Sequence, residues 1–184
     1  LFMFKNGTTE VEGIKFNRDE NLDNILKALP FKLTNAQNRA LNEIIEDMQS
    51  NKVMNRLVQG DVGSGKTVVA LLALANCVLN GYQGALMAPT EILAEQHYIS
   101  LSETLKPFGM EIELLVGSLT KKQKEKVLER VKNKEIDILI GTHALIEDKV
   151  EFNNLGIVIT DEQHRFGVRQ RSKLSEKGIN PDIL

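Results

Sequence analysis

A glycine-rich loop constrains this chain more than any other segment. Residues 60–67 read Gly-Asp-Val-Gly-Ser-Gly-Lys-Thr; they follow the strand-like run Arg56–Gln59 and open a helical pattern from Lys66 to Leu79. The loop matches the pattern G-x-x-x-x-G-K-[ST] at every specified position. Glycines let the backbone wind tightly, so that its amides point inward at the positive end of the following helix. The sequence therefore predicts a site for the phosphates of a nucleotide.

Two side chains of this loop have specific expected roles. Lys66 is expected to reach the β- and γ-phosphates, and Thr67 to supply a hydroxyl to Mg²⁺, a cation that prefers oxygen ligands. The set expected to bind the nucleotide phosphates is Gly60, Asp61, Val62, Gly63, Ser64, Gly65, Lys66 and Thr67. The structural alternative is a glycine-rich turn that holds no ligand. Such a turn would not need the correct residue at each specified position, so the full match favours a phosphate site.

Short apolar runs alternate with longer amphipathic segments along most of the chain. Besides Arg56–Gln59, strands are expected at Ala85–Ala88, Glu111–Val116, Ile136–Ile140 and Leu155–Thr160. Helices are expected from Thr34 to about Asn51, from Lys66 to Leu79, from Glu91 to Leu105 and from Thr120 to about Lys132. This alternation is typical of βαβ units. It predicts a three-layer α/β domain with a mostly parallel central sheet flanked by helices.

The first residues do not share this pattern. Residues 1–29 mix turn residues with isolated hydrophobic ones and show no sustained period, so we interpret them as a linker or lead-in and residues 30–184 as the globular unit. The chain starts at Leu1, and its last residues, Pro181 to Leu184, resemble the opening of another strand. We therefore expect it to be a piece of a longer protein.

An acidic pair follows the last predicted strand. Leu155–Thr160 leads directly into Asp161 and Glu162. A phosphate-binding loop holds phosphates without activating water, so a carboxylate is expected at the end of another strand. Asp161 is expected to hold Mg²⁺ through water, and Glu162 to polarise the attacking water as a general base. Together with the loop, the pair predicts nucleotide hydrolysis.

The net charge, the cysteine content and the hydropathy bear on nucleic-acid binding, on the cellular compartment and on membrane insertion. The formal net charge is −2, so the composition shows no basic footprint of nucleic-acid binding, and any such binding must come from local residues. The single cysteine, Cys77, lies in the apolar pattern Leu71–Leu79 and is expected to be buried and reduced, which fits the cytoplasm. The longest apolar stretch, Val68–Leu79, is too short for a membrane span.

Four segments together resemble the RecG family of superfamily 2 DNA helicases. Asp161–His164 reads Asp-Glu-Gln-His and is similar to a helicase motif, and its continuation through Arg171 narrows the likeness to that family. The other segments are Leu29–Gln37, similar to the adenine-recognition motif, Met87–His97, similar to motif Ia, and Gly141–Ile146, similar to motif Ib. Related transcription-repair coupling translocases more often carry Asp-Glu-Glu-His, so Gln163 favours the RecG family.

The resemblance implies a first RecA-like lobe of a monomeric motor that uses ATP to remodel branched DNA, such as replication forks and Holliday junctions, in repair and recombination. A wedge domain would precede it, and a second RecA-like lobe with the arginine finger would follow. The residues that the resemblance assigns to adenine are Phe31, Thr34 and Gln37, and those assigned to DNA or to coupling are Thr90, Thr142, His143, His164, Arg165 and Arg169.

Each of these assignments has a structural alternative. Gln37 alone reads as a polar surface residue, Thr90 and Thr142 as helix caps or turn residues, and His143 as a loop histidine. We interpret His97 as a residue that packs its helix.

Two other functional classes stay open. A GTPase or small-molecule kinase would use the same phosphate loop, but guanine recognition ordinarily needs Asn-Lys-x-Asp, and Asn133–Asp137 misses that spacing by one residue. The chain could also be a nucleotide-binding module without motor activity.

Overall fold

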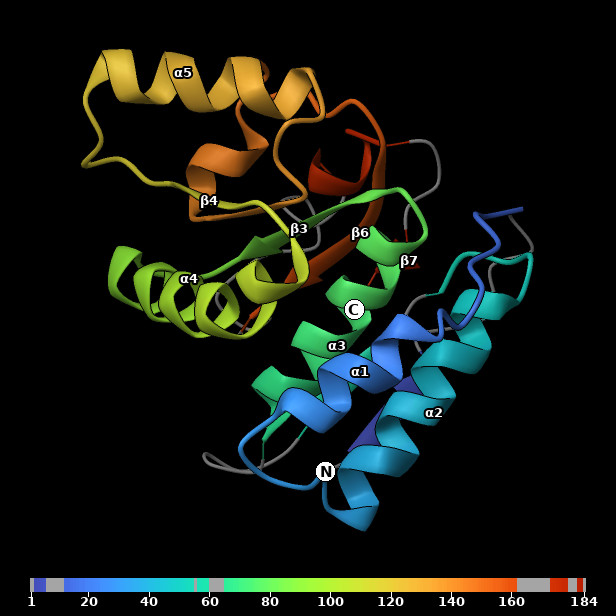
Figure 1. The fold of residues 1–184 in the computed structure, drawn as a ribbon. Coiled ribbons are helices and arrows are strands. Elements are labelled where there is room, and N and C mark those ends of the chain that lie inside the picture. Colours follow the sequence, from blue (N-terminus) through green and yellow to red (C-terminus); the bar gives the residue numbers. More distant parts are fainter. Residues whose placement is uncertain are drawn as a thin grey trace.

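The computed structural model describes residues 12–54, 65–161 and 173–178 with their side chains, and residues 2–5, 56–59 and 182–183 by their backbone. Within these ranges the chain forms a parallel sheet with helices on both faces (Figure 1). The predicted three-layer α/β architecture is therefore confirmed.

The central sheet contains five strands in the order β4-β5-β3-β6-β7, and every neighbouring pair is parallel. Their bounds are β3 Gln83–Met87, β4 Ile112–Leu115, β5 Ile138–Gly141, β6 Leu155–Thr160 and β7 Asp182–Ile183. Strands β3, β5 and β6 are buried at every residue, as expected of strands that are covered on both faces.

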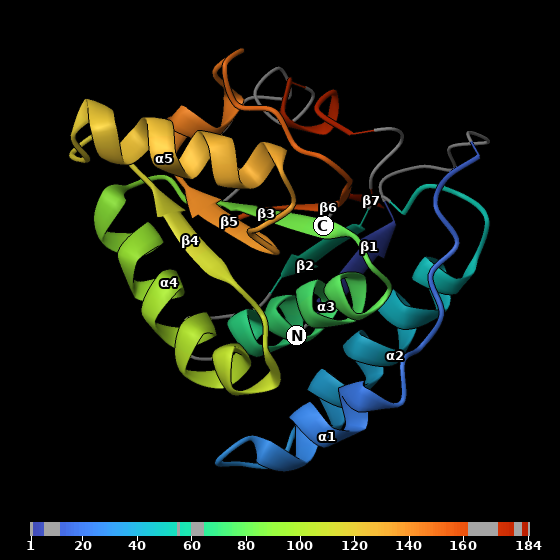
Figure 2. The ribbon, with the colours of Figure 1, turned by 45° about the horizontal axis from the view of Figure 1, so that its top comes forward.

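Helices cover both faces of the sheet. Their bounds are α1 Asn21–Ala28, α2 Asn35–Gln49, α3 Lys66–Leu79, α4 Glu91–Leu105 and α5 Lys121–Lys132, with short 3₁₀ turns η1 Lys106–Phe108 and η2 His143–Ile146. Figures 1 and 2 show α5 on one side of the sheet and α3 and α4 on the other. The core divides accordingly: Ile138 and Ile140 pack with α3 and α4, whereas Leu139 between them packs with α5.

Side-chain caps set where three of these helices begin. The hydroxyls of Thr34 and Thr120 accept hydrogen bonds from Gln37 N and Gln123 N, and both helices carry the reciprocal bond of a capping box. The hydroxyl of Thr90 accepts a bond from Leu93 N. Such caps satisfy amides that have no partner inside the helix. They are local in sequence, which is why the predicted helix starts agree with the structure.

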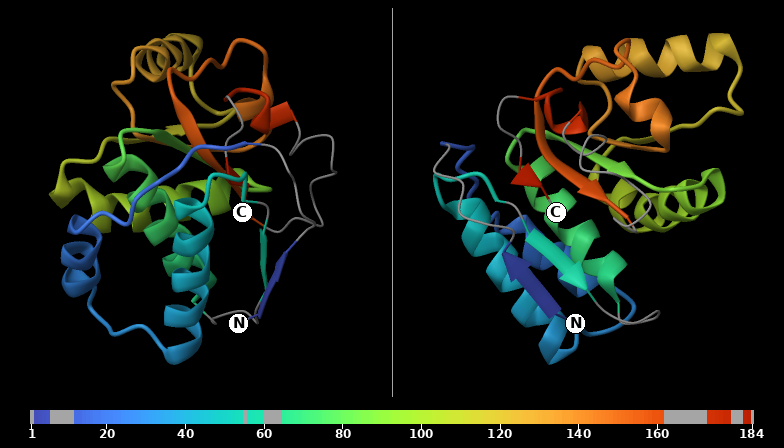
Figure 3. Two further views of the ribbon diagram at one scale, coloured as in Figure 1. Left: turned by 90° about the vertical axis from the view of Figure 1, so that its right-hand side faces the viewer. Right: turned by 180° about the vertical axis from the view of Figure 1, so that it is seen from behind.

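One predicted strand has an unexpected partner. Strand β2 (Arg56–Gln59) pairs antiparallel with β1 (Phe2–Lys5), in a two-stranded ladder separate from the parallel sheet (Figure 3). The expectation that this strand joins the parallel sheet is wrong. A run of residues with strand character shows that the backbone needs a partner, but the partner itself is decided by tertiary packing.

The lead-in segment contains a helix and part of the core. Within the segment interpreted as a linker or lead-in, Asn21–Ala28 forms α1, and Leu22 and Ile25 are fully buried. Phe16 is also fully buried and meets Tyr82 edge-on, with the ring centroids 5.2 Å apart. An eight-residue helix has only two turns, too few for a clear period in the sequence. The domain boundary at residue 30 stays a prediction.

Candidate functional site

Three strands end together at one edge of the sheet. Met87, the last residue of β3, is in register with Gly141 of β5 and Thr160 of β6. The residues that follow these strands therefore lie along the same edge, and they include Thr90, Thr142 and Asp161. In open parallel sheets, ligands bind outside the carboxyl ends of the strands. This edge is the candidate site.

Helix α3 points its amino-terminal end toward this edge. Near its other end, the Cys77 thiol contacts Gln83 O at 3.6 Å, at the start of β3. A Cβ placed on Gly156, at the start of β6, would come within 2.9 Å of the same sulfur. One helical turn earlier, Leu74 lies where a Cβ on Gly84 would meet it, one residue further along β3. The helix therefore runs back along the sheet, and Lys66 and Thr67 at its beginning lie toward the carboxyl edge.

The described end of the phosphate loop has the conformation that its glycine predicts. Gly65 adopts the left-handed region, with φ 80° and ψ 26°, directly before α3. A Cβ at this position would collide with the side-chain amide of Gln37. The backbone conformation therefore favours glycine, and any other residue would also have to displace the Gln37 amide. Gly60, Asp61, Val62, Gly63 and Ser64 lie outside the described residues, and their roles stay predictions.

Lys66 and Thr67 form the first turn of α3 and are exposed. The first turn of this helix carries no acidic side chain, so nothing in it opposes an anion at the positive end of the helix dipole. Most of the following helix is buried, including Val69, Leu72 and Ala73. A cation and a hydroxyl are therefore presented on a rigid support.

Gln37 joins helix α2 to the phosphate loop. It is only 7% exposed, so it is not the surface residue that one interpretation expected. Its Oε1 accepts a bond from Thr34 N at 2.9 Å, and its Nε2 donates to Gly65 O at 3.5 Å. Phe31, just before α2, is 49% exposed. Gln37 and its partner Thr34 therefore lie near the end of the loop, while contact of Phe31, Thr34 and Gln37 with a base stays a prediction.

Asp161 is held at two points. Its backbone N–H donates to Met87 O at 2.9 Å, and its carboxylate Oδ2 lies 2.8 Å from His97 Nε2 on α4. The interpretation of His97 as a packing residue missed this contact. The spacing of His97 between Ala94 and Leu101, which are both buried on the core-facing side of α4, indicates that His97 faces inward but does not indicate its partner.

The donor set at this edge fits a magnesium-bound nucleotide. Lys66 supplies a cation, and Thr67 and the partly exposed Asp161 supply oxygen atoms, which are the ligands that Mg²⁺ prefers. Next to Asp161, the Thr160 hydroxyl is buried and has no hydrogen-bond partner within the described part of the protein. Glu162, His164, Arg165 and Arg169 lie outside the described residues.

The residues expected to meet DNA also border this edge. Thr90 caps α4, so the structural alternative for its hydroxyl is confirmed, and a DNA contact by it stays a prediction. Thr142 is half-buried and precedes η2 without a side-chain cap bond to it. His143 is exposed.

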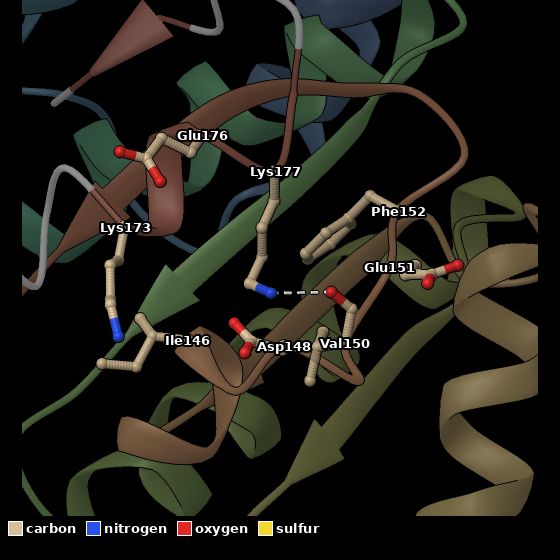
Figure 4. Close-up of a pocket in the computed structure, with 8 residues that line it drawn as sticks. All are labelled: Ile146, Asp148, Val150, Glu151, Phe152, Lys173, Glu176 and Lys177. Atoms are coloured by element: carbon tan, nitrogen blue, oxygen red, sulfur yellow. Dashed lines mark hydrogen bonds between the residues drawn. The ribbon is translucent and has the colours of Figure 1, made fainter.

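A separate pocket of about 430 Å³ lies on the α5 side of the sheet (Figure 4). Lys177 crosses it and donates to Glu147 O and Val150 O, each at 2.7 Å. Burial lowers the pKa of Lys177, while the carboxylates of Asp148, Glu151 and Glu147 oppose this shift. None of the residues lining this pocket is among those predicted to bind nucleotide, metal or DNA.

The chain is similar to proteins of known family. The model of the DEAD/DEAH box helicase family matches residues 34–180. Two curated relatives share the name ATP-dependent DNA helicase RecG. The protein from Bacillus subtilis is 58% identical over 90% of this chain and 24% of its own length. The protein from Aquifex aeolicus is 56% identical over 97% of this chain and 23% of its own length.

A solved structure agrees with these relatives. The structure of RecG bound to a three-way DNA junction superposes with a TM-score of 0.84 at 50% identity, over 94% of this chain and 23% of that one. The chain thus spans about a quarter of the length of the proteins it matches. In the described residues, no helix combines the length and the apolar character needed to cross a membrane.

Proposed function

This chain belongs to the DEAD/DEAH box helicase family, and from this premise we propose that it forms the ATP-binding RecA-like lobe of an ATP-dependent DNA helicase. The observation that carries the proposal is that Asp161 follows β6 at the carboxyl edge of a parallel sheet, while α3, whose other end lies at the start of β3 and β6, begins with Gly65–Thr67. The high identity to proteins named ATP-dependent DNA helicase RecG supports the same conclusion.

In the proposed chemistry, bound ATP with Mg²⁺ supplies the phosphoryl group and much of the charge neutralisation for its transfer. Lys66 would bind the β- and γ-phosphates, and Thr67 and Asp161 would hold the metal, the latter through water. Glu162 orients and polarises the attacking water. The first turn of α3 adds the positive end of its dipole.

Adenine recognition is assigned to Phe31, Thr34 and Gln37. The exposed ring of Phe31 offers an apolar face for a base, and the bond from Gln37 to Gly65 O ties the base-recognition segment to the phosphate loop. This link gives a physical reason why base identity would affect the phosphate site.

The DNA substrate of the proposed enzyme is branched duplex DNA. One related protein is seen bound to a three-way DNA junction. In this chain, Thr90, Thr142 and His143 follow neighbouring strands at the candidate site and would contact phosphates of the DNA backbone. His164, Arg165 and Arg169 would couple hydrolysis to movement.

The proposed motor needs parts beyond this lobe. We assign residues 30–184 to the ATP-binding lobe and residues 1–29 to a lead-in from a wedge domain, with a second RecA-like lobe supplying the arginine finger. The burial of Phe16, Leu22 and Ile25 favours a lead-in that is docked firmly on the lobe. The proposed protein is a monomer of the cytoplasm.

Other functions have weaker support. A transcription-repair coupling translocase would use the same lobe but is not the name that the relatives carry. For guanine recognition, Asp137 would have to face a base, yet its carboxylate accepts a bond from Glu111 N at 2.8 Å. The alternative from another functional class is a nucleotide-binding module without motor activity.

Binding of a fluorescent ATP analogue, with ATP and GTP as competitors, tests the proposal. ATP is expected to compete better than GTP. Lys66→Ala should weaken binding about 10–100-fold, which corresponds to the loss of a charged hydrogen bond. Lys122→Ala, on the exposed face of α5, is the matched control. Equal binding by Lys66→Ala and the control would refute the assigned site.

Steady-state ATP hydrolysis with and without three-way junction DNA separates a motor from a binding module. We expect this chain alone to hydrolyse ATP slowly and to unwind nothing, since the second lobe contributes the arginine finger. Joined to that lobe, it should hydrolyse ATP faster when junction DNA is added. DNA-independent turnover in the joined protein would favour the module.

A further inference from the structure

We propose that His97 is a positioning residue that orients the Asp161 carboxylate for Mg²⁺ and thereby makes helix α4 part of the metal site. This inference rests on the proposed function, since it assumes that Asp161 holds the metal through water. Nothing in the sequence assigned His97 to the site, because the two residues are 64 positions apart.

The chemistry of the acceptor decides which atom donates. His97 Nε2 lies 2.8 Å from Asp161 Oδ2, and an ionised carboxylate can only accept hydrogen bonds. The proton of this contact therefore resides on Nε2. One carboxylate oxygen is engaged by the imidazole, and this orients the carboxyl group as a whole.

The surroundings make the contact well defined. The His97 side chain is only 14% exposed, and its helix is anchored to the core by Ala94, Leu101 and Leu105. The backbone of Asp161 is independently attached to the end of β3 through Met87 O. The bond to the end of β3 thus fixes the position of Asp161, and His97 on α4 fixes the direction in which its carboxylate points.

Outer contacts of this kind matter in metal sites. Partners that hydrogen-bond to a direct metal ligand typically change metal affinity or activity about 10–100-fold when they are removed. Asp161 is placed one water molecule further out, so we expect an effect at the lower end of that range. A carboxylate that has lost its imidazole partner can rotate away from the metal-bound water. The expected consequence is a higher Mg²⁺ requirement, with little change in the binding of nucleotide without metal.

Equilibrium binding of a fluorescent ATP analogue tests this, measured against Mg²⁺ concentration and again in EDTA. For His97→Ala we expect the half-saturating Mg²⁺ concentration to rise about 10-fold, while affinity in EDTA is unchanged. His97→Gln, which retains a donor near the Nε2 position, should recover most of the effect. Gln96→Ala, an exposed neighbour on the same helix, is the matched control.

A double-mutant cycle adds a second readout. In an Asp161→Asn background, His97→Ala should produce no further change in the Mg²⁺ dependence, because the two residues would act as one unit. Thermal unfolding of every variant shows whether it is folded.

The outcomes are distinguishable. An unchanged Mg²⁺ dependence in folded His97→Ala overturns the positioning role, and so does an equal loss of affinity with and without Mg²⁺, which would indicate a structural residue. If the wild-type chain binds no ATP analogue under any condition, the proposed function itself fails. A raised Mg²⁺ requirement that His97→Gln restores supports the inference.

Discussion

The side-chain amide of Gln37 contacts the carbonyl oxygen of Gly65 at 3.5 Å and occupies the place that a Cβ on this glycine would take. Helix α2 and the end of the phosphate loop therefore constrain each other. The loop is shaped by its own glycines and also by a residue that the sequence associates with adenine.

Gly65→Ala should destabilise the protein and weaken nucleotide binding. The left-handed backbone costs about 1–2 kcal/mol for a residue with a Cβ, and the new methyl group must also displace Gln37. We expect a loss of about 2–4 kcal/mol in the free energy of unfolding, measured by urea denaturation, together with a lower affinity for an ATP analogue.

Gly81→Ala is the matched control for that substitution. Gly81 also adopts a positive φ, 87°, but a Cβ there would meet nothing within 4 Å. It should therefore show the backbone cost alone and leave ATP binding intact. If both variants lose the same stability and the same affinity, the collision with Gln37 has no role.

Gln83→Leu should be strongly destabilising although it preserves side-chain volume. The Gln83 amide is 1% exposed; its Nε2 donates to Val131 O and Ile136 O at 3.0 and 2.8 Å, and its Oε1 accepts from Asn154 N at 2.9 Å. Leucine leaves these buried groups unsatisfied, at a cost of about 2–4 kcal/mol. Chemical denaturation measures the loss, with the exposed Gln96→Leu as control. A loss below about 1 kcal/mol would mean that water replaces the amide.

Features that are decided by residues adjacent in the sequence were predicted correctly. The bounds of α3 and α4 were predicted correctly, because Gly65 and Thr90 mark their starts within the adjacent residues. Both ends of strand β6 were predicted correctly, because a six-residue, mostly aliphatic run followed by an acidic residue can be recognised without tertiary information.

Features that depend on partners distant in the sequence could not be predicted in this way. The pairing of β2 with β1 and the contact of His97 with Asp161 both join segments more than 50 residues apart, and no local pattern specifies either. Gln83 illustrates the same limit, because a single glutamine in an apolar run does not reveal three buried backbone partners.

The stability contribution of Asp137 should depend on pH. Burial raises the pKa of Asp137 above its ordinary value of 3.8, and the negative charge of Glu111 adds to this, while the bond from Glu111 N and the charge of Lys134 oppose it. Because the folded state holds this proton more tightly than the unfolded chain, the contribution is fully present below pH 3.8 and is lost as pH rises through the folded-state pKa.

Asp137→Asn removes this titration and keeps an oxygen that can accept from Glu111 N. The difference in unfolding free energy, variant minus wild type, should therefore increase as the pH rises from about 3 to about 6. Urea denaturation across that range measures it, with the exposed Asp148→Asn as control. A difference that stays constant or decreases would contradict the raised pKa.

Lys177→Met should loosen the segment that follows η2. The ammonium group bonds to Glu147 O and Val150 O, so it joins residues 173–178 to the loop between β5 and β6 (Figure 4). Methionine keeps an apolar stem but leaves both carbonyls without this donor, for an expected loss of about 1–3 kcal/mol. Lys173→Met, an exposed lysine of the same pocket, should cost much less. Amide hydrogen exchange provides the local measurement: protection at residues 147–150 should fall in Lys177→Met and remain in Lys173→Met, and equal protection in both would show that the bonds do not hold the loop.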